Sequence, residues 1–290
     1  MNDPHFFIVT PTYNRSHLIR RTIQSVLDQD YKHYSLYLCD DGSKDDTLSV
    51  IQSYSSHPNV SVLSMGVNSG VNKTRNKMLD VIQAEKKNGF IILLDDDDFL
   101  TPTALQDLVN IIHKHPLEQW IVTGCVTPDG KPITVFNQTG SACCVAKEKG
   151  KKAAVERDAT HCMHINLVGD IRFTEQFKNG EEWFFFVKLA KKSKMYVVDI
   201  LTKIVEYQEQ GLSHQKYNLE HKASVHRLKV DTMAGFVSED RLNKEKLLLA
   251  RELIKLLDWA AAKQTLSDIP YSHRFSLRFI RYRLKVLFHA

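Results

Sequence analysis

The sequence has no long apolar run. Across its 290 residues, no stretch approaches the roughly 18 consecutive apolar residues of a membrane-spanning helix. The N-terminus, Met1 to His5, also lacks the basic segment followed by a long apolar one that marks a secretion signal. These two absences predict a protein of the cytoplasm.

Cysteine is scarce, and no Cys-x-x-Cys pair occurs. The five cysteines are Cys39, Cys125, Cys143, Cys144 and Cys162. An odd number without paired spacing argues against a disulfide framework and against a zinc site. The sequence also has no Gly-x-Gly-x-x-Gly loop after its first apolar run, which disfavours a dinucleotide-dependent dehydrogenase.

The net positive charge is concentrated at the C-terminus. The chain has 39 basic and 34 acidic residues, a net charge of +5, and residues 273–290 alone contain five Arg or Lys residues and no acid. These bases alternate with aromatic and aliphatic residues, as in helices that lie along an anionic membrane surface. We therefore expect membrane association, with docking on the protein core as the alternative. Nucleic-acid binding is not expected, because the rest of the chain is formally neutral.

The first hundred residues alternate apolar runs with amphipathic helical patterns, which is typical of a parallel sheet built from βαβ units. The runs expected to form strands are residues 6–10, 36–39, 60–63, 90–94 and 120–122. We predict an α/β fold with a mostly parallel, Rossmann-like sheet and helices on both faces.

Beyond residue 125 the patterning changes twice. Residues 127–160 are rich in Gly, Lys and small residues and are expected to form a loop. From Ser238 to Trp259 the apolar spacing is again helical and predicts a helix that packs on the core. We therefore expect one domain over residues 1–235, with halves 1–125 and 126–235, and a helical extension over residues 236–290 that ends in the basic segment.

Two of the predicted strands end in acidic residues. Asp95 to Asp98 follow the apolar run 90–94, and Asp40-Asp41-Gly42-Ser43 follows the run 36–39. Neighbouring carboxylates repel one another, and a hard divalent cation such as Mg²⁺ or Mn²⁺ relieves that repulsion. Either cluster alone would be read as a solvated turn. Because ligands of open α/β sheets bind beyond the carboxyl ends of the strands, the two together predict a ligand site.

Four motifs, in this order, resemble the nucleotide-sugar half of family 2 glycosyltransferases with the GT-A fold. They are residues 9–14 (Val-Thr-Pro-Thr-Tyr-Asn), 40–47, 68–76 (with Asn-Ser-Gly and Arg-Asn) and 94–98 (Leu-Asp-Asp-Asp-Asp). The resemblance is dense over residues 6 to about 125 and thinner to about 215. It implies that the first half of the domain binds the donor and the second half binds the acceptor.

The resemblance assigns roles to particular residues. It implies a donor-binding set made of Pro11, Tyr13, Asp41, Asn68, Arg75, Asp95 and Asp96. Pro11 and Tyr13 would line the uridine pocket, and Asp41 would bind the uracil. Asp97 would be the principal ligand of an Mn²⁺ or Mg²⁺ ion, with Asp95 toward the ribose or the metal.

The resemblance also extends to an acceptor-side segment. Residues 179–183 (Asn-Gly-Glu-Glu-Trp) are similar to the family segment in which Glu-Asp-Trp supplies the catalytic base, and Glu182 stands here where Asp is usual. A carboxylate at this place would take the proton of the acceptor hydroxyl. Glu181 is the second candidate, and a pair of acids that merely begins a helix is the alternative. Many such enzymes complete the metal shell with a histidine, but Gln208 stands at that position and His214 lies nearby.

Together these expectations describe an inverting, metal-dependent glycosyltransferase that moves a hexose from a UDP-sugar to a saccharide hydroxyl. The basic tail points to a lipid-diphosphate-linked acceptor at the inner face of the cell membrane, as in O-antigen or capsule biosynthesis. A sugar-1-phosphate nucleotidyltransferase would need a Gly-rich, Arg-containing loop after the first strand, where this chain has residues 11–14 (Pro-Thr-Tyr-Asn). A non-catalytic binding protein on a degenerate transferase fold would have lost the metal carboxylates.

Overall fold

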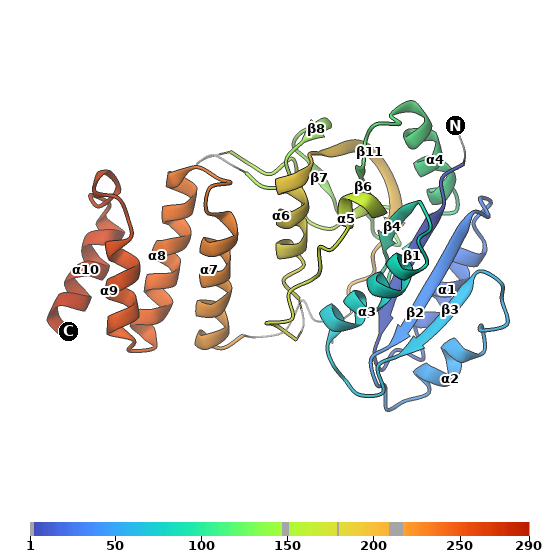
Figure 1. Ribbon diagram of the computed structural model, residues 1–290, viewed down its shortest axis with the longest axis horizontal. Helices are drawn as coiled ribbons and strands as arrows, with labels where there is room; N and C mark the ends of the chain where they lie inside the picture. The colour runs from blue at the N-terminus through green and yellow to red at the C-terminus, as the bar shows by residue number, and fades with distance from the viewer. Residues whose placement is uncertain (1–2, 147–150, 179, 209–216, 290) are drawn as a thin grey trace. The chain divides into compact units, whose positions relative to one another are not determined.

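The computed structural model describes residues 3–146, 151–178, 180–208 and 217–289. The chain divides into two compact units (Figure 1): residues 1–144 with 153–212, and residues 145–152 with 213–290. The sequence places the division after residue 235. In the structure helix α7 (Leu219–Met233) belongs to the second unit, because Ala223 packs into that unit's core.

Within the described residues, the first unit contains a nine-stranded mixed sheet. In spatial order its strands are β3 (Val60–Ser64), β2 (Tyr34–Asp40), β1 (Phe6–Thr12), β4 (Phe90–Leu93), β10 (Ala159–His164), β6 (Trp120–Val126), β11 (Met195–Ile204) and β5 (Phe99–Leu100), with β8 (Gly140–Ala142) paired to β11. The first four are parallel, β10 is antiparallel to both neighbours, and β6 is parallel to β11. A separate pair, β7 (Val135–Phe136) and β9 (Val155–Glu156), lies in the region expected to be a loop.

Helices cover both faces of this sheet, as predicted. Phe6 and Ile8 of β1 point into one core, shared with α1 (Ile19–Leu27), α2 (Thr47–Gln52) and α4 (Ala104–Lys114). Phe7 and Val9 point into the other core, shared with α3 (Val71–Ala84), α5 (Ile165–Val168) and α6 (Trp183–Lys192). Successive strand residues face opposite ways, so a continuous apolar strand serves two cores.

The strands β1, β2 and β4 end at the same edge of the sheet. Thr12 pairs with Asp40 in the parallel register, and the N–H of Leu94 donates to the carbonyl of Val9 at 3.0 Å. Residues 13, 41 and 95 therefore emerge together, at the edge where an open α/β sheet binds its ligands.

The second unit is helical. It contains α7, α8 (Glu239–Lys255), α9 (Trp259–Ser267), the short 3₁₀ helix η2 (Tyr271–His273) and α10 (Leu277–His289). The apolar pattern from Ser238 to Trp259 forms two helices rather than one, because Leu257 has a φ of 61° and the Asp258 side chain caps α9 by accepting the N–H of Ala261. Among the described residues, no helix is long and apolar enough to cross a membrane.

Candidate active site

The acidic turn after β4 is held by its backbone. The hydroxyl of Thr22 in α1 donates to the carbonyls of Asp96 (3.0 Å) and Asp98 (2.8 Å), and Arg21 donates to the carbonyl of Asp97 (3.3 Å). Thr22 is buried, so this attachment is shielded from water. The turn is therefore attached to α1 through main-chain oxygens.

Asp98 is neutralised inside the protein. Its carboxylate forms an ion pair with Lys203 of β11 at 2.7 Å, and both residues are buried. Burial raises the pKa of Asp98 to about 6, although the charge of Lys203 acts the other way. Burial tends to lower the pKa of Lys203, but Asp98 outweighs this and raises it. Asp98 is therefore engaged in a structural pair and is not a candidate metal ligand.

Asp96 and Asp97 are destabilised as carboxylates. Asp96 accepts the N–H of Tyr13 at 3.4 Å, and its other oxygen lies 3.7 Å from Nε of Arg15. Burial, together with repulsion from Asp97 and Asp95, still raises the pKa of Asp96 to about 7. Burial and repulsion from Asp95 also raise the pKa of Asp97. A cation at this place would relieve both groups.

The carboxylates fit an open site for a hard divalent ion. Among the described residues, no three His, Cys, Asp or Glu side chains converge as in a closed metal site. Mg²⁺ usually takes one or two carboxylates and completes its shell with water and substrate phosphates. At such a site Asp97 would supply one carboxylate, because no other residue in the described part of the chain donates a hydrogen bond to it. Asp95 would supply a second, through the oxygen that Arg75 does not contact.

Asp96→Asn is expected to stabilise the metal-free protein at pH 8. The pKa of Asp96 is 3.8 in the unfolded reference and about 7 when folded. The folded state therefore favours protonated Asp96. The stability that this gives is present in acid and is lost as the pH rises through about 7. Asn does not titrate, so the variant should gain on the order of 2–4 kcal/mol at pH 8 and match the wild type near pH 4. Urea unfolding in chelator measures this, with the exposed Asp46→Asn as control; equal stability at pH 8 would contradict it.

Arg75 of α3 joins the acidic turn to the beginning of α6. Its Nη2 donates to Oδ1 of Asp95 at 2.6 Å, and its Nη1 donates to Oε1 of Glu182 at 2.7 Å. The Arg75 side chain is 5% exposed, against 48% for Asp95 and 37% for Glu182. Burial tends to lower the pKa of Arg75, but the two carboxylates outweigh this and raise it, so the guanidinium remains charged. The predicted base and a predicted metal ligand are thus bound to one side chain.

Two asparagines on α3 hold the acceptor-side segment: Asn76 belongs to the third motif but has no role assigned by the sequence, and Asn72 is not part of any quoted signature. Asn72, Arg75 and Asn76 share one helix face, because they are three and four residues apart. Asn72 Nδ2 donates to the carbonyl of Gly180 at 2.9 Å, and Asn76 accepts the N–H of Phe173 at 2.8 Å and donates to its carbonyl at 3.1 Å. Both asparagines are buried. Two amides and an arginine on the inward face of a helix are the sequence signal that could have identified them.

Asp41 is engaged by the backbone that precedes α3. It is buried, and its two oxygens accept the N–H groups of Ser69 (2.7 Å) and Gly70 (2.8 Å). Gly70 has a φ of 95°, and a Cβ there would lie 2.0 Å from the carbonyl oxygen of Lys178, so only glycine fits. The prediction that Asp41 binds uracil stays a prediction. In this structure its carboxylate fixes the loop that carries Asn68.

The other residues predicted for the donor lie around the same strand ends. Pro11 is buried at the end of β1, and Tyr13 follows it half-buried. Asn68 Oδ1 and Arg75 Nε are buried polar atoms without a hydrogen-bond partner among the described residues. Because such atoms are normally paired, these two are unsatisfied polar groups at the candidate site.

Glu181 and Glu182 have different backbones. Glu181 has a φ of 63°, whereas Glu182 is helical, with a φ of −53°, and precedes the first residue of α6. Glu182, the first candidate for the base, accepts a hydrogen bond from Arg75. Gln208 donates to the carbonyl of Glu206 at 3.2 Å, and His214 lies outside the described residues, so the histidine prediction stays a prediction.

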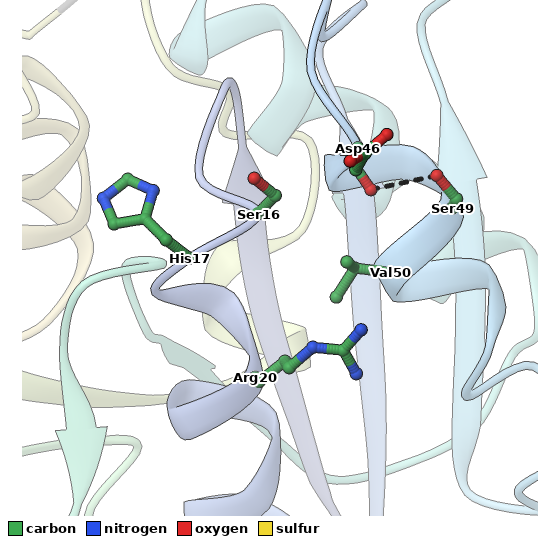
Figure 2. Close-up of a pocket in the computed structure, with 6 residues that line it drawn as sticks. All are labelled: Ser16, His17, Arg20, Asp46, Ser49 and Val50. Atoms are coloured by element: carbon green, nitrogen blue, oxygen red, sulfur yellow. Dashed lines mark hydrogen bonds between the residues drawn. The ribbon is translucent and has the colours of Figure 1, made fainter.

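A surface cavity of about 450 Å³ lies between the beginnings of α1 and α2 (Figure 2). It is lined by Ser16, His17, Arg20, Asp46, Ser49 and Val50. The hydroxyl of Ser49 donates to the carbonyl of Asp46 at 3.1 Å. None of the residues predicted for the donor, the metal or the base lines this cavity.

Comparisons with known proteins identify relatives of this chain. The model of the family "Glycosyl transferase family 2" matches residues 7–165. The GalNAc(5)-diNAcBac-PP-undecaprenol beta-1,3-glucosyltransferase of Campylobacter jejuni is 27% identical over 199 residues, which cover 67% of this chain and 62% of that protein. The poly(ribitol-phosphate) beta-N-acetylglucosaminyltransferase TarS of Staphylococcus aureus is 26% identical over 189 residues, which cover 63% of this chain and 32% of TarS. The chain thus spans less than two thirds of either relative.

Solved structures share the fold. S. aureus TarS 1-349 in complex with UDP-GlcNAc has a TM-score of 0.65 at 19% identity, covering 98% of this chain and 81% of that one. The mannosyltransferase PcManGT of Pyrobaculum calidifontis, in complex with GDP-Man and Mn²⁺, has a TM-score of 0.57 at 14% identity, covering 99% and 87%. The likeness to TarS confirms the predicted GT-A fold.

Proposed function

The chain belongs to glycosyl transferase family 2, and from that membership we propose that it is an inverting, metal-dependent enzyme that transfers a hexose from a UDP-sugar to a saccharide hydroxyl. The observation that carries this proposal is the Arg75 bridge between Asp95 and Glu182. Single displacement needs a base on the acceptor side close to the donor's phosphate site, because attack and departure occur at one anomeric carbon. The guanidinium of Arg75 holds the proposed base, Glu182, close to Asp95 at the proposed phosphate site.

The donor is proposed to lie across the ends of β1, β2 and β4. The unpaired Asn68 Oδ1 and Arg75 Nε offer one acceptor and one donor to a nucleotide there. Pro11 and Tyr13 supply an apolar and aromatic wall at the end of β1. The complex of TarS with UDP-GlcNAc supports a uridine nucleotide.

The proposed chemistry assigns one proton transfer to the protein. Glu182 accepts the proton of the acceptor hydroxyl as its oxygen bonds to the anomeric carbon, and the bond from that carbon to UDP breaks. Asp97 and Asp95 would hold Mn²⁺ or Mg²⁺, which when bound stabilises the charge on the leaving diphosphate. Arg75 orients Glu182 and adds a fixed positive charge beside the donor.

The acceptor is proposed to be a lipid-diphosphate-linked saccharide, within O-antigen or capsule-type polysaccharide biosynthesis. The name of the Campylobacter relative, which includes PP-undecaprenol, supports this class of acceptor. An enzyme for such an acceptor would work as a peripheral protein at the inner face of the cell membrane.

A screen of UDP-sugars tests the proposed activity. In Mn²⁺ we expect one UDP-hexose or UDP-N-acetylhexosamine to be consumed well above the others, with transfer to a short lipid-diphosphate saccharide. NMR of the product should show an anomeric configuration opposite to that of the donor. Release of diphosphate from UTP and a sugar 1-phosphate would instead identify a nucleotidyltransferase, and retention of configuration would contradict direct displacement by an activated hydroxyl.

A further inference from the structure

Large apolar side chains are exposed in one short segment of the helical unit. Twelve such side chains are exposed in the described part of the chain, and seven of them lie within residues 271–288: Tyr271, Phe275, Leu277, Ile280, Leu284, Leu287 and Phe288. Scattered exposed apolar residues are ordinary, whereas a contiguous group marks an interaction surface. This concentration therefore needs a partner.

Helix α10 has two separate apolar faces. Phe279 and Val286 are two turns apart, 2% and 3% exposed, and pack in the core of the helical unit. Leu277, Ile280 and Leu284 follow one another at spacings of three and four residues on a different face, and are 86%, 43% and 48% exposed. Packing in the core of the helical unit thus uses only the face with Phe279 and Val286. The outer face of α10 consists of the exposed residues Leu277, Ile280, Leu284, Leu287 and Phe288.

Basic side chains border the outer face. Arg278, Arg281 and Lys285 lie along one side at helical spacing, and Arg283 lies on the other; all four are exposed. Among the described residues none of the four forms an ion pair. The fifth base, Arg274, is used internally, since it donates to the carbonyls of Ser267 and Ile269 at the end of α9. The charge beside the outer face is therefore uncompensated.

We propose that the outer face of α10 binds an anionic phospholipid membrane. A helix of 13 residues is about 20 Å long, too short to span a bilayer but able to lie in its interface. Leu277, Ile280 and Leu284 then enter the acyl boundary while the bordering bases meet lipid phosphates. The charge pattern selects anionic lipid over a second copy of the chain, because a second outer face would bring its own four bases against these.

Flotation of the full chain with phosphatidylcholine vesicles, with and without phosphatidylglycerol, tests this surface. Binding should require phosphatidylglycerol and weaken with salt. Arg281→Gln/Lys285→Gln should lower partitioning about thirtyfold, since each base near an anionic surface contributes about 1 kcal/mol. Ile280→Ser/Leu284→Ser should lower it at least about tenfold, because two buried aliphatic side chains are lost. Leu117→Ser, which removes a 92% exposed leucine of the first unit, should change nothing.

The outcomes separate the surface from the catalytic proposal. All four positions on α10 are exposed, so the melting temperature of each variant should equal that of the wild type. UDP-sugar hydrolysis in solution should also be unchanged, so loss of flotation with retained hydrolysis supports a membrane role. Equal binding by wild type and variants, or no binding to anionic vesicles, overturns it. Dimers that dissociate in the Ile280→Ser/Leu284→Ser variant, without vesicle binding, would assign the outer face to self-association instead.

Discussion

Asp97→Ala is expected to abolish sugar transfer while leaving the metal-free protein folded. Asp97 is the carboxylate of the acidic turn to which no other described residue donates a hydrogen bond, so its removal breaks no such bond. It also removes a repulsive neighbour of Asp96, and stability at neutral pH should therefore not fall. A bound metal stabilises the leaving diphosphate by several kcal/mol, so kcat/KM should drop roughly 10³-fold or more.

The measurement pairs activity with binding. Mn²⁺ should tighten UDP binding to the wild type and have little effect on Asp97→Ala, as followed by calorimetry. Asp98→Asn serves as a contrast, because it leaves the buried Lys203 without its partner and should destabilise the fold by about 3–5 kcal/mol. Full activity of Asp97→Ala, or of the wild type in excess chelator, would show that the acidic turn does not act through a metal.

The location of the candidate site follows from the sequence because it depends on local patterns and one rule of topology. The apolar runs 6–10 and 90–94 form β1 and β4, and the residues that follow parallel strands meet at one edge of the sheet. The sequence alone therefore places together the motifs that end these strands.

The contacts within the site could not be predicted in the same way. Arg75 and Glu182 are 107 residues apart, and nothing in the local pattern of either segment specifies the other. The sequence resemblance makes Arg75 a nucleotide contact, whereas its guanidinium also joins two carboxylates. Asn72 and Asn76 look like ordinary polar helix residues until the acceptor-side segment packs against them.

The boundary between α8 and α9 could not be predicted for a different reason. Leu256 and Leu257 continue the apolar spacing of α8, so periodicity extends the helix across them. The structure ends α8 at Lys255, because a positive φ at Leu257 lets Asp258 cap the next helix. Backbone turns of this kind depend on packing between helices, which apolar spacing does not report.

Glu182→Gln is expected to lower kcat about 10²–10⁴-fold with little change in the affinity for the donor. Glutamine keeps the volume of the side chain, and its carbonyl oxygen can still accept the hydrogen bond from Nη1 of Arg75. What it loses is the ability to take a proton from the acceptor hydroxyl. The substitution therefore separates two roles of this residue, orientation of Arg75 and base catalysis.

The outcome of three substitutions decides between these roles. If Glu182 only orients Arg75, Glu182→Gln should retain most activity, because the hydrogen bond survives. If Glu182 is the base, Glu182→Asp should have a higher kcat than Glu182→Gln, because it restores a carboxylate, although one methylene further back. Aspartate is also the residue usual at this position in the family segment. Glu181→Gln should stay active, because Glu182 is the residue that contacts Arg75. Loss of activity in Glu181→Gln but not in Glu182→Gln would place the base one residue earlier.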